Sequence, residues 1–178
     1  MSNPETPRVV AATVDDVDAV TDQWVTLARD QRRHGSTLLA SANRAAVRNW
    51  VARSVVTGEL LVAREGNGSD ERPDEEAIVG FVAFSIERDG YERDGTRGTV
   101  SNLFVSPERR NEGIGAALLA AAERELAAAG ADAVALEALA DNERARSFYA
   151  DHGYDLHRVE LRKEVGEESE GPDGSGGE

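Results

Sequence analysis

Two arginines followed by two glycines form the part of this sequence whose spacing best supports chemistry. Arg109 and Arg110 precede Gly113 and Gly115, which open an alanine-rich stretch with helical periodicity. Unpaired N–H groups and the positive end of the helix dipole make a helix start an anion site. A glycine within a helix costs about 1 kcal/mol relative to alanine, so two in one turn require a reason. Close approach of a phosphate to the backbone is such a reason, and the arginines add positive charge beside it.

Two common phosphate-binding loops do not fit this passage. The dinucleotide pattern G-x-G-x-x-G requires Gly or Ala at position 118, where this chain has Leu118. The nucleotide P-loop requires Gly-Lys followed by Ser or Thr, and the sequence contains no such run. Both of these phosphate-binding patterns are therefore absent from this passage.

The run Arg110-x-x-Gly113-x-Gly115 resembles the R/Q-x-x-G-x-G/A signature of the GNAT N-acetyltransferases. A second signature of that family, L-E followed by N-x-x-A-x-x-x-Y and G-F/Y, resembles a later set of residues in the same order: Leu136, Glu137, Asn142, Ala145, Tyr149, Gly153 and Tyr154. The two signatures cover about residues 99–155 and are separated by a predicted helix and strand.

The resemblance implies an acyltransferase that moves an acetyl group from acetyl-coenzyme A to an amine of a small molecule, a protein N-terminus or a lysine. The backbone of 103–105 (Leu103, Phe104 and Val105) would hold the acetyl carbonyl and the pantetheine arm. Asn142 would contact that arm, and Tyr149 would stand near the sulfur. The pyrophosphate would lie against the N–H groups of Arg110, Asn111, Glu112, Gly113, Ile114, Gly115 and Ala116.

The sequence has no cysteine, which excludes an acyl-thioenzyme and favours direct attack by the amine in a ternary complex. Tyr149 is the expected proton donor to the leaving thiolate. Glu137 is the first candidate for the base, and the region of Ser101 and water are the alternatives. The pattern departs from relatives at Leu139, where N-terminal acetyltransferases with this Glu usually carry Arg, and at Ser101, where many relatives carry Glu. A non-catalytic acyl-CoA-binding or regulatory module is the alternative.

The composition and charge of the chain further narrow the classes of protein to which it can belong. The 178 residues carry a formal charge of −14, and only one of the 20 basic residues, Lys163, is a lysine. This charge opposes nonspecific nucleic-acid binding and adds self-repulsion that salt screens, so we expect a halophilic protein. The three histidines lack metal-ligand spacing, so no metal is expected. With no membrane-length apolar run and no export signal, the chain is expected to be cytoplasmic, and a homodimer is allowed by analogy of fold.

The order of the expected elements suggests one mixed sheet with helices on both faces. The resemblance implies an α+β (three-layer α/β) fold of the GNAT type, in which this sheet is mostly antiparallel. Strands are expected at 8–12, 60–63, 77–86, 98–105, 131–138 and 154–164, and helices at 13–31, 43–58, 113–129 and 142–152. A solvated loop at 65–76 and a hairpin connection at 87–95 carry turn residues. Residues 1–165 form one domain, and 166–178 are expected to be a disordered acidic tail.

Overall fold

The computed structural model describes residues 7–65, 77–88, 90, 92 and 94–165. Within them, the strands are β1 (Arg8–Ala11), β2 (Leu60–Arg64), β3 (Ile78–Ile86), β4 (Arg97–Val105) and β5 (Ala133–Leu136). The α-helices are α1 (Val17–Gln31), α2 (Arg44–Thr57), α3 (Ile114–Ala128) and α4 (Glu143–Asp151). Short 3-10 turns, η1 (Val14–Asp16), η2 (Arg32–His34) and η4 (Pro107–Arg109), begin or extend these elements.

The five strands form one sheet in the order β1-β2-β3-β4-β5. Each of the first three pairings is antiparallel, and β4 pairs with β5 in parallel. The parallel pair follows from the connection, because α3 crosses from the end of β4 back to the start of β5. The predicted mixed, mostly antiparallel sheet is confirmed.

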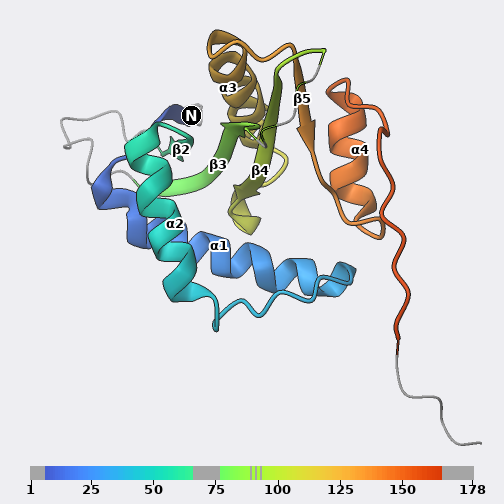
Figure 1. The fold of residues 1–178 in the computed structure, drawn as a ribbon. Helices are drawn as coiled ribbons and strands as arrows, with labels where there is room; N and C mark the ends of the chain where they lie inside the picture. Colours follow the sequence, from blue (N-terminus) through green and yellow to red (C-terminus); the bar gives the residue numbers. More distant parts are fainter. Residues whose placement is uncertain (1–6, 66–76, 89, 91, 93, 166–178) are drawn as a thin grey trace, which may run out of the picture.

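Helices cover both faces of this sheet (Figure 1). On one face, α1 and α2 bury a cluster that includes Val20, Trp24 and Val51 against Phe81 and Phe104 of the sheet. On the other face, α3 buries a second cluster against β2, β3 and β4, and aromatic residues of α4 pack on its margin. The predicted helices on both faces are therefore confirmed.

A buried ion pair joins the start of α1 to β2. Asp16 and Arg64 are each only 6% exposed, and the Arg64 guanidinium donates to both carboxylate oxygens at 2.7 and 2.8 Å. The same carboxylate accepts from the backbone N–H of Thr13 at 2.7 Å, which closes a capping box at the helix start. Because two buried charges tolerate little displacement, this pair fixes where α1 leaves the sheet.

The predicted strand at 154–164 is wrong. This segment is extended, but it pairs with no described strand and runs beside α4 at the outside of the molecule (Figure 1). A period of two fits an extended backbone, yet a strand also needs a neighbour that accepts its hydrogen bonds. The predicted loop at 65–76 except for its first residue, the whole predicted tail at 166–178 and parts of the hairpin connection lie outside the described residues.

Candidate functional site

A free strand edge forms where β4 continues beyond its pairing with β5. The parallel register joins Arg97–Val100 of β4 to Ala133–Leu136 of β5, and β4 then runs on to Val105. In the described part of the chain, the edge of 101–105 that faces away from β3 has no partner strand. Backbone N–H and C=O groups require hydrogen-bond partners. This edge therefore offers extended backbone to a ligand that lies along it.

A β-bulge at Ser101 marks the point where the two strands part. Ala83 pairs with Asn102 and Phe84 pairs with Val100, which leaves Ser101 without a counterpart on β3. The Ser101 hydroxyl donates to the carbonyl of Ala83 at 3.3 Å. The extra residue reverses the alternation of the strand. Val100 packs under α3, whereas Phe104 packs under α1 and α2.

The loop after β4 presents backbone amides at the start of α3. Asn111 and Gly113 both have positive φ, 65° and 82°, so the chain turns through left-handed conformations as it enters the helix. No side chain caps α3 at this end. Ala117 donates the first intrahelical bond, to Gly113 at 3.0 Å, so the N–H groups of 114–116 precede the helical ladder. Such an arrangement of amides attracts anions.

The two arginines of this loop are paired with carboxylates. Arg109 bonds to Glu112 at 2.8 Å and to Glu65. Arg110 donates to the carbonyl of Val105 at 3.1 Å and to Asp30 of α1 at 3.3 Å. The sequence suggested two guanidinium groups facing a diphosphate; in this structure both are engaged within the protein. The backbone amides are left as the main positive element of the loop, and the arginines hold its shape.

Gly115 lies where α4 packs on the first turn of α3. A side chain there would meet the Phe148 ring at 3.5 Å and Val105 at 3.7 Å, which is ordinary van der Waals contact. Ile114 is buried in the cluster under α3. The protein itself therefore does not require glycine at 115.

Tyr149 lies on α4 in an aromatic group beside the sheet. Its ring meets Phe148 edge-on at 5.2 Å and Tyr154 at 5.8 Å. Burial raises the pKa of Tyr149 above that of a free tyrosine. The pKa of Tyr154 is raised further by burial and by its hydrogen bond to Glu123, at 2.7 Å. Both phenols stay protonated through the physiological range.

Two further predicted residues flank α4. The Asn142 side-chain oxygen accepts from the backbone N–H of Ala145 at 3.1 Å, so Asn142 is the N-cap of the helix. Glu137 is exposed and lies directly after the end of β5. Asn142 therefore has a structural role that the sequence pattern alone did not distinguish from ligand contact.

The three predicted residues of β4 have side chains that serve the core. Phe104 is buried with its ring 6.0 Å from that of Phe81. Leu103 and Val105 pack on the margin of the cluster under α3. A ligand at the free edge of β4 would therefore meet the backbone of these residues, and their expected roles toward the cofactor stay predictions.

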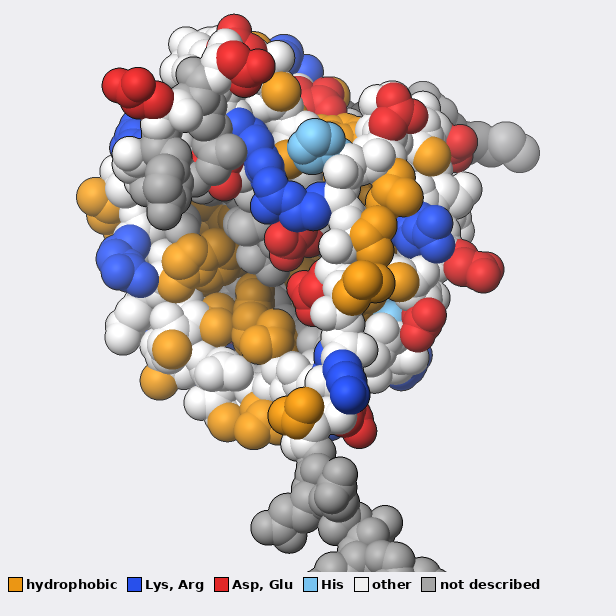
Figure 2. Space-filling model, turned by 45° about the vertical axis from the view of Figure 1, so that its right-hand side comes forward, with side chains coloured by type: hydrophobic (Ala, Val, Ile, Leu, Met, Phe, Trp, Pro, Cys, Tyr) orange, Lys and Arg blue, Asp and Glu red, His pale blue; other side chains and the backbone are white. Residues whose placement is uncertain are grey.

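A pocket of about 330 Å³ opens between α1, α2 and β4. It is lined mainly by apolar side chains, with two asparagines, from α1, the loop before α2, α2 and β4: Trp24, Leu38, Asn43, Ala46, Val47, Trp50 and Asn102. Figure 2 shows a hollowed face of the molecule with hydrophobic side chains on its lower left wall and charged side chains on its other rims. Trp24 is also part of the core cluster under α1 and α2, and Trp50 packs against that cluster. No pattern in the sequence singles out Asn102.

The sequence matches the acetyltransferase (GNAT) family over residues 42–154. This match spans more than half of the 178 residues, and the chain belongs to this family. The free edge of β4, the uncapped start of α3 and the aromatic group on α4 all lie within the matched region. The chain is thus an acyltransferase by family, and acetyl-CoA is the co-substrate that the family uses.

Solved structures show the same fold. A GCN5-related N-acetyltransferase from Ralstonia eutropha JMP134 aligns with 89% of this chain and 97% of its own, at 23% identity and a TM-score of 0.65. A transcriptional regulator from Bacillus halodurans C-125 covers 89% and 99% at 15% identity and a TM-score of 0.64. A possible acetyltransferase from Clostridium difficile 630 covers 90% and 99% at 17% identity and a TM-score of 0.65. Comparison with curated protein sequences finds no match.

Neither a membrane-spanning helix nor a metal-binding group occurs among the described residues. No helix among them has the length and hydrophobicity needed to cross a membrane. No group of three or more His, Cys, Asp or Glu side chains among them is arranged to hold a metal ion.

Proposed function

We propose that this protein is an N-acetyltransferase that moves the acetyl group of acetyl-CoA to an amine by direct attack in a ternary complex. The observation that carries the proposal is the adjacency of two backbone features. The unpaired edge of β4 ends at Val105, and the uncapped start of α3 follows nine residues later at Ile114. The acyl-pantetheine arm would lie along the strand edge and bond to its backbone, as an added β-strand does. The diphosphate at the other end of the arm would then reach the N–H groups at the helix start.

In the proposed step, the amine nitrogen forms a bond to the thioester carbonyl carbon and the C–S bond then breaks. A backbone N–H of the β4 edge stabilises the oxyanion that forms on the carbonyl oxygen. The Tyr149 hydroxyl gives its proton to the departing thiolate. Its raised pKa keeps the hydroxyl protonated in the pH range where amines begin to lose their proton, so the proton is present when the thiolate leaves.

The attacking nitrogen must be neutral. An amine with a pKa near 10.4 is mostly protonated at pH 7, and removing its proton costs about 4–5 kcal/mol, whereas an α-amine near pKa 8 costs about 1 kcal/mol. Glu137 directly follows the end of β5, where the pairing of β5 with β4 stops at Val100, and is the proposed base. The alternative is that a chain of water molecules removes the proton. Glu137→Gln distinguishes the two, because activity would persist in this variant if water were the base.

The acceptor is proposed to be an amine that carries an apolar or aromatic group. Asn102 follows the bulge directly, so the pocket lies beside the strand segment that would hold the thioester. Trp24 and Trp50 supply broad apolar faces, while Asn43 and Asn102 supply the amide groups of the lining. Such a pocket favours burial of a hydrocarbon or ring and offers no charged side chain to a polyamine or a phosphorylated sugar.

Two measurements test the proposal together. Calorimetry with acetyl-CoA in molar KCl should detect binding, and thiol release should follow when an amine is added. Heat of binding without turnover on any amine would indicate the acyl-CoA-binding or regulatory module instead. Absence of binding would refute the site altogether.

The acceptor class has its own test. We expect 2-phenylethylamine to have a higher kcat/KM than ethanolamine, and Trp50→Ala to raise the KM of the former only. Trp50→Phe should restore most of the difference. Equal kcat/KM values for the two amines in the wild-type protein would overturn the apolar acceptor while leaving acetyl transfer in place.

A further inference from the structure

A side chain closes the free edge of β4 at its last carbonyl. The N–H of Ser106 donates to the carbonyl of Val79 in β3 at 2.9 Å. The N–H and C=O of one peptide group point to opposite sides of a strand, so the carbonyl of Val105 belongs to the free edge. Arg110 Nε donates to this carbonyl at 3.1 Å. The part of the edge that is open to a ligand therefore stops at the Arg110 guanidinium.

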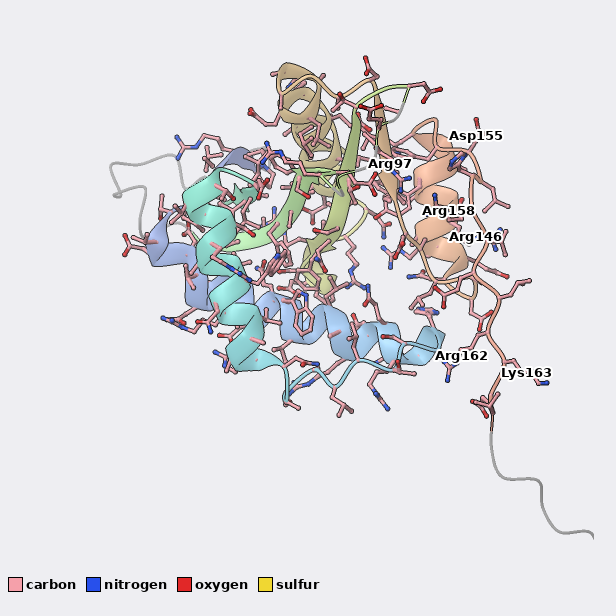
Figure 3. All side chains as sticks on the ribbon, in the orientation of Figure 1. Arg97, Arg146, Asp155, Arg158, Arg162 and Lys163 are labelled. Carbon is pink, nitrogen blue, oxygen red and sulfur yellow. The ribbon has the colours of Figure 1, made fainter. Side chains whose placement is uncertain are left out.

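Asp30 of α1 holds that guanidinium from another side. Arg110 Nη2 donates to Asp30 Oδ2 at 3.3 Å, and the two side chains are 29% and 33% exposed. Arg33 also lies near this carboxylate, but at 3.9 Å and with 81% of its side chain exposed. Figure 3 shows the labelled Arg146 and Arg158 on α4 and on the segment after it, away from α1. Among the described residues, Arg110 is therefore the main partner of Asp30.

The position of Asp30 within its own helix is unfavourable for a carboxylate. Asp30 is the last residue but one of α1, where the negative end of the helix dipole repels negative charge. A residue that breaks a local rule without local compensation indicates a tertiary or functional role. Here the compensation comes from Arg110, 80 residues further along the chain, in the loop that leads from the β4 edge to the start of α3.

The same turn of α1 also holds the loop that forms one wall of the apolar pocket. Arg29 donates to the Ser41 hydroxyl at 3.1 Å, and Arg32 donates to the carbonyl of Leu38 at 3.2 Å. Leu38 lines the pocket. The end of α1 is thus bonded to the loop of the proposed acceptor site and, through Asp30, to the loop of the proposed phosphate site.

We propose that Asp30 is a positioning residue for acetyl transfer, which through Arg110 fixes the end of the β4 edge and the loop before α3 relative to the acceptor pocket. A carboxylate holds a guanidinium more strongly than a neutral amide does, so the charge of Asp30 is what the role requires. The inference rests on the proposed function, because it assigns a role to Asp30 within that same site.

Hydrogen exchange in the ligand-free protein tests this link without any cofactor. Asp30→Asn removes the charge and keeps the size of the side chain. The backbone amides of 106–117 should exchange about tenfold faster in this variant than in wild type, because local opening costs less when a charge-assisted contact is weakened. Asp18→Asn is the matched control, since it breaks another ion pair of α1, with Arg48 of α2 at 2.7 Å. Equal exchange of these amides in the two variants would overturn the proposal.

Calorimetry with acetyl-CoA in molar KCl tests the consequence for binding. At that salt the screening length is about 3 Å, so the loss of one distant charge has little direct effect. Asp30→Asn should raise the Kd about tenfold, and Asp30→Glu, which keeps the charge, should restore most of the affinity. In the Arg110→Gln background Asp30→Asn should have no further effect, because both substitutions remove one contact. Tighter binding in Asp30→Asn would show that Asp30 withholds Arg110 from the ligand, and would overturn the proposal.

The failure of this inference is distinguishable from the failure of the proposed function. If wild type binds acetyl-CoA and Asp30→Asn matches Asp18→Asn in both exchange and affinity, the role of Asp30 is wrong and acetyl transfer stands. If wild type binds no acetyl-CoA, acetyl transfer is wrong and the role of Asp30 is wrong with it.

Discussion

Replacing Gly113 by glutamate, and comparing the result with the same replacement at Gly58, should show whether Gly113 serves ligand binding or only the backbone conformation. Gly113 has φ +82° and Gly58, at the C-terminal end of α2, has φ +72°. Both are exposed, and a Cβ at either would meet nothing within 4 Å. A left-handed conformation costs a non-glycine residue about 1–2 kcal/mol. Gly113→Glu and Gly58→Glu should therefore lose similar free energies of unfolding, each with one added negative charge.

The two variants should differ in affinity for acetyl-CoA. At position 113 the new carboxylate stands at the start of α3, where the diphosphate is proposed to bind. A like-charge contact near 4 Å costs about 1 kcal/mol in bulk water and about 4 kcal/mol at an effective dielectric constant of 20. Since 1.4 kcal/mol is tenfold in Kd, we expect a loss of about fivefold to 1000-fold at position 113 and none at 58.

Calorimetry with acetyl-CoA measures the affinities, and urea denaturation measures the stabilities. The comparison should be made at moderate KCl as well as molar KCl, because salt screens part of the repulsion. Unchanged affinity in Gly113→Glu, or an equal loss in Gly58→Glu, would refute the assignment of the α3 start as the phosphate site.

Three other outcomes are expected. Tyr149→Phe should lower kcat by about 10- to 100-fold and leave the Kd for acetyl-CoA unchanged. Tyr154→Phe, which also loses a hydroxyl, is the control and should keep the wild-type kcat. Equal kcat values in wild type and Tyr149→Phe would show that Tyr149 is not the proton donor. Because burial raises the pKa of Tyr149, no loss of donor activity is expected below pH 10, the ordinary tyrosine value. Arg64→Met should lower the free energy of unfolding by about 3–5 kcal/mol, because it leaves the buried Asp16 carboxylate uncompensated. The double variant Asp16→Ala/Arg64→Met should lose less than the sum of the losses in the two single variants. Additive losses in denaturant unfolding would contradict this coupling. Raising KCl from 0.1 to 2 M should raise the Tm by several degrees, because salt screens the repulsion within a protein of net charge −14. A constant Tm in a thermal scan would show that the acidic surface is not a salt adaptation.

Local signals in the sequence were enough for most elements. The stripe of Val17, Val20, Trp24, Leu27 and Ala28 predicted α1; Leu27 is partly buried against the core cluster, and the other four side chains are buried. Gly58 was expected to end α2 and does so in the left-handed conformation. These predictions are confirmed because each depends on periodicity or on a backbone conformation that one residue type favours.

Signals that depend on distant partners were weaker. The period of two at 154–164 predicted a strand, but whether a strand forms depends on a neighbour that periodicity does not specify. Trp24 belongs to the core cluster and Trp50 packs against it, and both also line the pocket between α1, α2 and β4, which depends on how these elements pack together. A bulge cannot be read from Ser101 by itself, since it depends on the register with Ala83 and Phe84 of β3.

The sequence by itself determined the family, through the order and spacing of Arg110, Gly113, Gly115, Asn142 and Tyr149, because those spacings describe contiguous backbone and single helix turns. Only the tertiary structure decided which charges are free. The guanidinium groups of the loop are held by carboxylates from α1 and the end of β2, residues far from them in the chain. Ion pairs between distant segments follow from how the helices pack on the sheet, and no local pattern encodes that packing.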